Sequence, residues 1–132
     1  MKVIFTCGGT AGHVNPALAL AGYMRKQDPT VEILFVGTPN GIERGLVAEA
    51  GYDYRGIEVG SFERSMDLDS LRHNAKSAVE LLTLRRRAQA ILREFPADLV
   101  VGTGGYASFP VVNEAAHRGK KRITFGKRPA PE

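Results

Sequence analysis

The run KVIFTC (residues 2–7) passes directly into GGTAGHVNP (residues 8–16), and this stretch is the strongest indicator of the fold. The first run is apolar and rich in strand-favouring residues, which is typical of a buried strand. Pro16–Lys26 then carries apolar residues at helical spacing. A buried strand, a glycine-rich turn and a helix in this order predict the first unit of a parallel α/β sheet.

The same alternation of short apolar runs and longer helical patterns continues along the chain. Further strands are expected at Val31–Gly37, Tyr52–Val59, Asp98–Gly102 and Arg122–Phe125, and helices at Gly41–Ala50, Leu68–Phe95 and Ser108–His117. Because parallel strands are joined by right-handed crossovers, this order predicts an α/β fold: a doubly wound, Rossmann-like parallel sheet with helices on both faces.

Composition indicates one globular domain with its own core, since the chain has 132 residues of which 43% are hydrophobic. Cys7 is the only cysteine, so a disulfide within the chain is excluded, and its apolar surroundings favour a small buried hydrophobe over a nucleophile. The sequence has neither a signal-peptide pattern nor an apolar run of ~20 residues, so we expect a cytosolic protein. The net charge of +4 is concentrated in Arg85–Arg87 and in residues 118–128. Such clusters suit a phosphate ligand, nucleic acid or an anionic membrane, or are a solvated surface.

The first glycine loop, residues 8–12, has the features of an anion-binding turn. Its glycines let the backbone approach a ligand closely, and the following helix offers free N–H groups at its N-terminus. We expect Asn15 to cap that helix and Pro16 to lie in its first turn. His13 would stand at the mouth of the site, where a side chain that titrates near neutral pH suits a general base or a phosphate ligand. The alternative is a tight turn with a capping histidine and no ligand.

The second glycine loop, GTGGYASFP (residues 102–110), also follows a predicted strand directly. The carboxyl ends of parallel strands meet at one edge of a sheet, so the two loops should face each other and form a cradle for a diphosphate or a sugar. Ser108 can cap the helix that follows. The loop matches the dinucleotide pattern G-x-G-x-x-A, but no acidic residue stands ~20 positions downstream to hold a ribose, so a nicotinamide or flavin site is a weak alternative. Close helix–strand packing is the other alternative.

The long helix predicted at Leu68–Phe95 carries two apolar stripes, displaced by roughly 130° around its axis. The first stripe contains Leu68, Leu71, Ala75, Ala78, Val79 and Leu82, and the second contains Leu81, Leu84, Ala88, Ile91, Leu92 and Phe95. Either the helix breaks near Leu82 or it packs on two surfaces, and we expect the second stripe to cover the sheet. The first stripe, with Arg86 close to its line, suits an anionic membrane interface. The residues alone slightly favour packing within the domain.

At three places the sequence resembles the MurG family of bacterial glycosyltransferases. GGTAGHVNPALA (residues 8–19) is similar to the family's first glycine loop, G-G-T-G-G-H-x-x-P-A-L-A, and residues 102–110 to its second, G-x-G-G-Y-x-S-x-P. Between them, Val36-Gly37-Thr38 followed by Ile42-Glu43 resembles the family's V-G-T…x-E stretch. The resemblance covers roughly Met1 to Lys120, and the paired loops at this separation are far more specific than either loop alone.

The resemblance implies that the chain is one half of a GT-B glycosyltransferase, in which two Rossmann-like domains enclose a cleft. Its N-terminal domain would hold a lipid-linked muramyl-peptide acceptor. The reaction implied is transfer of N-acetylglucosamine from UDP-GlcNAc to undecaprenyl-diphosphate-MurNAc-pentapeptide (lipid I to lipid II) in peptidoglycan synthesis, by direct displacement with inversion. No cofactor, metal or nucleic acid is expected. The enzyme would be peripheral, on the anionic cytoplasmic face of the bacterial plasma membrane.

The same resemblance assigns roles to individual residues. His13 matches a proposed base for the acceptor hydroxyl. The residues expected to bind the acceptor are Gly8, Gly9, Thr10, Ala11, Gly12, Asn15, Thr103, Gly104, Gly105, Tyr106 and Ser108. The residues expected to form a membrane patch are Leu71, Val79, Leu82, Arg85 and Arg86.

Two departures from the family pattern limit these expectations. Ala11 stands where glycine is common, a small change if its φ is negative. Residues 122–132 do not read as the family's H-E-Q-N segment, so residues 1–120 are predicted to form the acceptor domain and 121–132 a divergent tail, for which truncation and a frameshift are the alternatives. The C-terminal donor domain lacks a counterpart in this sequence, and we expect the chain to be inactive alone, as a fragment or as one half of a split enzyme. The remaining alternatives are a nucleotide- or dinucleotide-binding module and a non-catalytic membrane- or partner-binding module.

Overall fold

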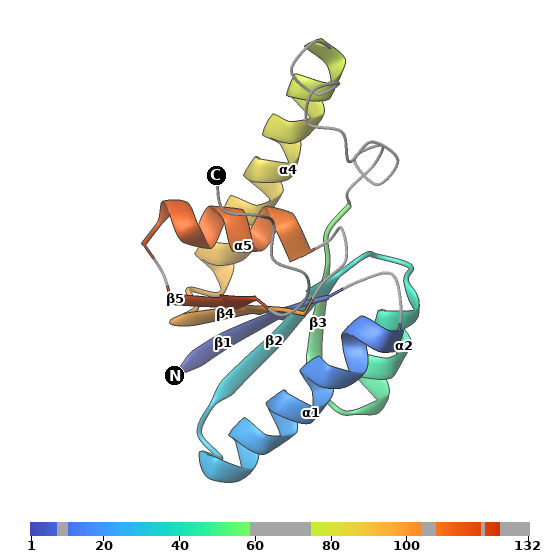
Figure 1. Cartoon of the computed structure of the whole chain (residues 1–132), viewed down its shortest axis with the longest axis vertical. Helices are drawn as coiled ribbons and strands as arrows, with labels where there is room; N and C mark the ends of the chain where they lie inside the picture. The colour runs from blue at the N-terminus through green and yellow to red at the C-terminus, as the bar shows by residue number, and fades with distance from the viewer. Residues whose placement is uncertain (8–10, 59–74, 104–107, 120, 125–132) are drawn as a thin grey trace.

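A computed structural model describes residues 1–7, 11–58, 75–103, 108–119 and 121–124. Its centre is a five-stranded sheet of parallel strands in the order β3-β2-β1-β4-β5 (Figure 1). The strands are β1 (Lys2–Thr6), β2 (Glu32–Gly37), β3 (Asp53–Gly56), β4 (Leu99–Gly102) and β5 (Lys121–Thr124). The helices are α1 (Ala11–Gln27), α2 (Ile42–Glu49), α4 (Ala75–Glu94) and α5 (Ser108–His117). The predicted α/β fold with a doubly wound parallel sheet is confirmed.

The helices form one layer on each face of the sheet, α1 and α2 on one and α4 and α5 on the other (Figure 1). Alternate residues of β1 supply the two cores, because successive side chains of a strand point to opposite faces. Val3 and Phe5 pack with α1 and α2, whereas Ile4 packs with α4 and α5. Burial on both faces explains why these strands read as continuous apolar runs in the sequence.

Helix α4 is continuous from Ala75 to Glu94, so of the two alternatives for this helix the break near Leu82 is wrong. The prediction that the second stripe covers the sheet is confirmed, since Leu84 and Leu92 are buried in the core with their neighbours on the same side. The first stripe behaves differently: Val79 is 64% and Leu82 50% exposed. The expectation that the first stripe packs within the domain is therefore wrong for these two described residues. The N-terminal half of α4 extends past the sheet, where no described helix covers it (Figure 1). Leu68 and Leu71 lie outside the described residues.

Helix α1 begins at Ala11, five residues before the predicted start. Asn15 and Pro16 consequently lie inside the helix, and the expectations that Asn15 caps it and Pro16 sits in its first turn are wrong. The physical reason is Val14, which is fully buried and continues the core-facing positions Ala17 and Ala21 toward the N-terminus. Pro16 has no N–H and therefore cannot donate a helical hydrogen bond to the Gly12 carbonyl. The free energy gained by burying the Val14 side chain outweighs the loss of this bond.

The predicted end of α5 is confirmed by Gly119, whose φ of +67° is the left-handed conformation that commonly terminates a helix. Pro110 is the third residue of α5 and lies in its first turn. The predicted last strand is also present, as β5 paired with β4. Lys121–Thr124 therefore belongs to the sheet, whereas residues 125–132 lie outside the described residues. No helix in the described part of the chain is long and apolar enough to cross a membrane.

Candidate functional site

The chain reverses its direction of winding between β1 and β4, which lie side by side in the middle of the sheet. Thr6, the last residue of β1, is in register with Val36 of β2 on one side and with Gly102 of β4 on the other. The connection after β1 leads to α1 on one face, and the connection after β4 leads to α5 on the other (Figure 1). This is a topological switch point, where open α/β sheets bind ligands beyond the carboxyl ends of their strands.

Two hydrogen bonds fix the places where the glycine loops leave the sheet. The Thr103 N–H donates to the Thr6 carbonyl at 3.0 Å, and the Cys7 N–H donates to the Val36 carbonyl at 3.0 Å. The prediction that both loops start at the same edge of the sheet is therefore confirmed. Residues 8–10 and 104–107 lie outside the described residues, so the cradle between Gly8, Gly9, Thr10, Gly104, Gly105 and Tyr106 stays a prediction.

The N-termini of α1 and α5 follow these two loops. Gly12 and His13 are the second and third residues of α1, and Ser108 is the first residue of α5. The N–H groups of a first helical turn have no partner within the helix and carry its positive dipole end. Ala11, Gly12 and His13 therefore offer N–H groups at the switch point, which suits an anionic ligand. The side chains of His13 and Ser108 lie outside the described residues.

Two other residues predicted to bind the acceptor are placed by the structure. Asn15 is exposed in the second turn of α1, one turn away from the helix end. Thr103 is only 6% exposed, and its hydroxyl lies 3.5 Å from the Thr6 carbonyl. Its described contacts thus join the ends of β4 and β1.

The Glu43 carboxylate is a buried polar group beside this edge, and no role was predicted for it from the sequence. Glu43, the second residue of α2, is fully buried, and its carboxylate accepts hydrogen bonds from Thr38. Cys7 is also fully buried; burial, with a smaller contribution from the Glu43 charge, raises the pKa of its thiol to about 12. The interpretation of Cys7 as a small hydrophobe is confirmed. The only signal for Glu43 was its place in the V-G-T…x-E stretch.

The arginines predicted to line a membrane patch have different environments. Arg85 Nε donates to Glu114 Oε2 at 3.2 Å, and Arg118 Nε donates to Glu114 Oε1 at 3.3 Å. Glu114 is 3% exposed. Burial alone would raise the pKa of its carboxyl, but hydrogen bonds from Arg85, Arg118 and Gln89 outweigh burial and hold the pKa below its usual value. Arg85 thus ties α4 to α5, whereas Arg86 is exposed.

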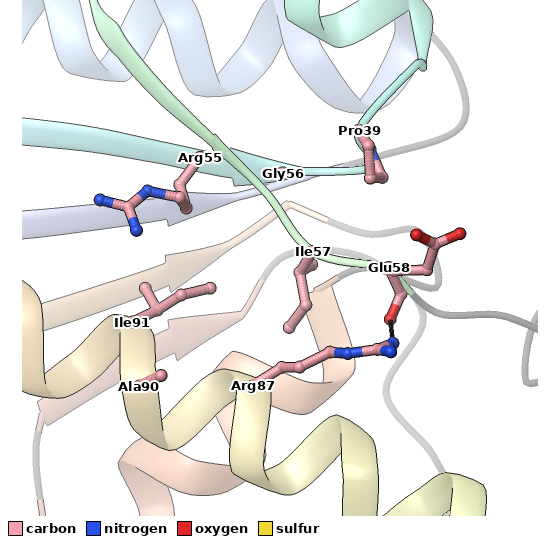
Figure 2. A pocket seen from close by; sticks show the side chains of 8 residues that line it. All are labelled: Pro39, Arg55, Gly56, Ile57, Glu58, Arg87, Ala90 and Ile91. Carbon is pink, nitrogen blue, oxygen red and sulfur yellow. Dashed lines mark hydrogen bonds between the residues drawn. The ribbon is translucent and has the colours of Figure 1, made fainter.

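A pocket of about 340 Å³ lies at the β3 edge of the sheet (Figure 2). Figure 2 shows Arg87 reaching from α4 along this pocket, where its Nη1 donates to the Glu58 carbonyl at 2.6 Å. Ile57, the first residue after β3, and Ile91 of α4 point into it. Pro39 follows the end of β2 and Ile57 follows the end of β3, so the pocket adjoins the carboxyl edge of the sheet, with β2 between β3 and β1.

Comparison with known families decides between the interpretations of this edge. The model of the glycosyltransferase family 28 N-terminal domain matches residues 3–125, which include every described element of the sheet from Val3 onward. The chain belongs to this glycosyltransferase family 28 N-terminal domain family. The match spans both glycine loops and β5, and it favours the glycosyltransferase interpretation of the switch point over a dinucleotide site.

Two curated relatives of this family 28 domain carry the same name. The chain is 43% identical over 116 residues to the UDP-N-acetylglucosamine–N-acetylmuramyl-(pentapeptide) pyrophosphoryl-undecaprenol N-acetylglucosamine transferase of Listeria monocytogenes, and 42% identical over 116 residues to the protein of the same name from Acetivibrio thermocellus. Each alignment covers 88% of this chain, but 31% and 30% of the two relatives. The chain thus spans about a third of the length of the relatives it matches.

A solved structure shares the fold of this family 28 domain. The crystal structure of MurG from Acinetobacter baumannii superimposes with a TM-score of 0.73 and 22% sequence identity, over 93% of this chain and 34% of that one. At this level of identity the likeness shows the fold alone.

Proposed function

We propose that this chain is the acceptor-binding part of an inverting N-acetylglucosaminyltransferase. The complete enzyme would move N-acetylglucosamine from UDP-GlcNAc to undecaprenyl-diphosphate-MurNAc-pentapeptide in peptidoglycan synthesis. The observation that carries the proposal is the pairing of Thr6 with Gly102 at the switch point of a family 28 domain, because it starts both glycine loops at one edge of the sheet. The names of the relatives supply the substrates.

In this proposal the two loops and the two helix N-termini hold the diphosphate of the acceptor. Backbone N–H groups of glycine-rich turns approach phosphate oxygens closely, and the positive ends of α1 and α5 favour the negative charge. The +4 net charge of the chain acts in the same direction. The binding residues proposed are those of residues 8–12 and 103–106, together with Asn15 and Ser108.

The chemical step proposed for this chain is proton removal by His13. The acceptor hydroxyl oxygen forms a bond to the anomeric carbon of the donor sugar while the bond from that carbon to UDP breaks, which inverts the configuration. His13 accepts the hydroxyl proton, a role for which a histidine is suited because it titrates near neutral pH. Its place in the first turn of α1 supports the proposal, because this turn lies at the switch point. The donor site would be supplied by a second domain, so we expect no transfer by this chain alone.

Helix α4 is the proposed site of contact with the membrane. Val79 and Leu82 present exposed apolar side chains, and exposed Arg86 adds a positive charge on the same helix. Apolar residues rimmed by cations suit the interface of a membrane that contains anionic lipid. Arg85 is proposed to support this surface by fixing α4 to α5 rather than by contacting lipid. From the family resemblance, this contact is proposed to lie at the cytoplasmic face of the plasma membrane, where the protein would act.

The proposal is tested by titrating the chain with a short-chain polyprenyl-diphosphate-MurNAc-pentapeptide. We expect saturable binding that is weakened in His13→Ala and in Gly104→Val. The matched control is Gly45→Val in α2, because nothing lies within 4 Å of the position that a side chain would occupy there. Undiminished binding in both loop variants would refute the assignment.

A further inference from the structure

The carboxylate of Glu43 is enclosed beneath the turn between β2 and α2. Its Oε1 accepts hydrogen bonds from the Thr38 backbone N–H at 2.8 Å and from the Thr38 hydroxyl at 2.5 Å. Its Oε2 is buried and has no hydrogen-bond partner within the described part of the chain. A buried carboxylate oxygen without a partner destabilises the folded state, so an apolar residue that filled the same space would give a more stable fold.

The surrounding chain is shaped to accommodate this carboxylate. Gly41 lies directly against both carboxylate oxygens, and a Cβ at this position would overlap them. The Tyr54 hydroxyl donates to the Thr38 carbonyl at 2.6 Å, from the other side of the turn. Burial, followed by the charge of Glu43, raises the pKa of the Tyr54 hydroxyl, so this group stays a hydrogen-bond donor at neutral pH.

Gly37, the last residue of β2, lies between Glu43 and Cys7, the residue after β1. A Cβ at Gly37 would lie 2.8 Å from the Cys7 carbonyl oxygen and 2.8 Å from Glu43 Cγ, so these groups are in close contact around the glycine. Cys7 is also bonded to the neighbouring strand through its N–H. Glu43 and the last residue before the first glycine loop therefore belong to one packed unit.

We propose that Glu43 is a positioning residue for acceptor binding. By anchoring the turn at Thr38–Gly41 next to Gly37, which lies against the Cys7 carbonyl, it fixes the point at which the first glycine loop leaves the sheet. Because Glu43 is fully buried, it acts through this turn and does not touch the ligand. The two hydrogen bonds to one oxygen specify a single turn geometry, which an apolar side chain of the same volume does not do. The inference rests on the proposed function, since it concerns the loop assigned to the acceptor diphosphate.

The test compares Glu43→Gln with Glu49→Gln, a change of the same kind at an exposed position of the same helix. Each variant is titrated with the short-chain polyprenyl-diphosphate-MurNAc-pentapeptide, and its thermal unfolding is followed in parallel. Glutamine can keep the acceptor for Thr38 only by placing an NH2 group at the position of Oε2, which has no hydrogen-bond partner in the described part of the chain. We therefore expect Glu43→Gln to bind about tenfold more weakly, the factor that ~1.4 kcal/mol represents, and Glu49→Gln to bind like the parent. In the full-length enzyme, Glu43→Gln should raise KM for the lipid acceptor and leave KM for UDP-GlcNAc unchanged.

Two variants of Thr38 keep the test decisive if Glu43→Gln does not fold. Thr38→Val removes the hydroxyl donor to Glu43 and should weaken binding, whereas Thr38→Ser retains the donor and should restore it. A lowered melting temperature with unchanged affinity in Glu43→Gln or Thr38→Val would mean a purely structural role and overturn the inference. Failure of the parent chain to bind the acceptor would instead overturn the proposed function, which separates the two outcomes.

Discussion

The backbone N–H of Thr103 donates a hydrogen bond to the carbonyl of Thr6 at 3.0 Å, although the two residues are separated by most of the chain. This bond joins the carboxyl ends of β4 and β1, where both glycine loops begin. Because parallel neighbouring strands end together, two loops distant in sequence become the two sides of one site. The proposed site depends on this juxtaposition, together with the family 28 assignment and the position of His13 in α1.

The contact between α4 and α5 should depend on pH through Glu114. Its folded-state pKa is lowered by Arg85, Arg118 and Gln89, so its stabilisation is complete above the unfolded-state pKa and is lost as the pH falls through the folded-state value. We expect the free energy of unfolding of the parent to fall in acid, and Glu114→Gln to flatten that dependence. Urea unfolding measured from neutral pH down to about pH 3 checks this. An unchanged slope in Glu114→Gln would show that other carboxylates cause the acid effect.

Replacement of Arg85 and Arg86 should separate a structural arginine from a surface arginine. Arg85→Met removes one of the two cations that hold the buried Glu114 carboxylate, and we expect it to lower the free energy of unfolding by about 1–2 kcal/mol. Arg86→Met should leave that free energy within about 0.5 kcal/mol, as is usual for exposed positions. Equal losses in the two variants, measured by urea denaturation, would contradict the environment described for Arg85.

Substitutions at exposed positions of α4 should reduce membrane binding without lowering the stability of the fold. Leu82 is half exposed, so Leu82→Ser and Arg86→Gln should both reduce flotation with vesicles that contain anionic phosphatidylglycerol, while melting temperatures stay close to that of the parent. Tyr23→Ser on α1, also at an exposed position, is the matched control and should float like the parent. Vesicles of phosphatidylcholine alone should bind less of every variant. Normal flotation of both α4 variants would place the membrane contact elsewhere.

Cys7 should resist thiol reagents in the folded protein. With a pKa raised to about 12, its thiol is almost entirely protonated at pH 8, and only the thiolate is reactive. We expect iodoacetamide to modify the native chain very slowly at pH 8 and the chain unfolded in guanidinium rapidly. Mass spectrometry follows the reaction. Because the folded-state pKa is raised, the stabilisation linked to this thiol is present below its ordinary pKa of 9.0 and is lost as the pH rises toward 12.

Much of the fold was predictable because its central strands are buried on both faces. The runs around Ile4, Leu34 and Val100 contain little but apolar residues, and alternation with helical patterns then implies a parallel sheet. The place of the glycine loops followed from the same reasoning, since loops after parallel strands share an edge. The second apolar stripe of α4 was predictable from its spacing alone.

The remaining features depend on tertiary contacts that local patterns do not contain. Asn15 and Pro16 are ordinary signals for a helix start, yet burial of Val14 extends α1 beyond them. Arg85 reads as a surface cation until α5 brings Glu114, 29 residues away, into contact. Glu43 reads as an exposed acid near the start of a short helix, and only the packing of the turn around Thr38 buries it.

The most direct measurement is calorimetric titration of the chain with a short-chain polyprenyl-diphosphate-MurNAc-pentapeptide, beside NAD and FAD as competing ligand classes. We expect saturable binding of the lipid-linked acceptor, weakened by His13→Ala and Gly104→Val and unaffected by Gly45→Val, with no saturable binding of either dinucleotide. Saturable binding of NAD or FAD together with no binding of the acceptor would contradict it.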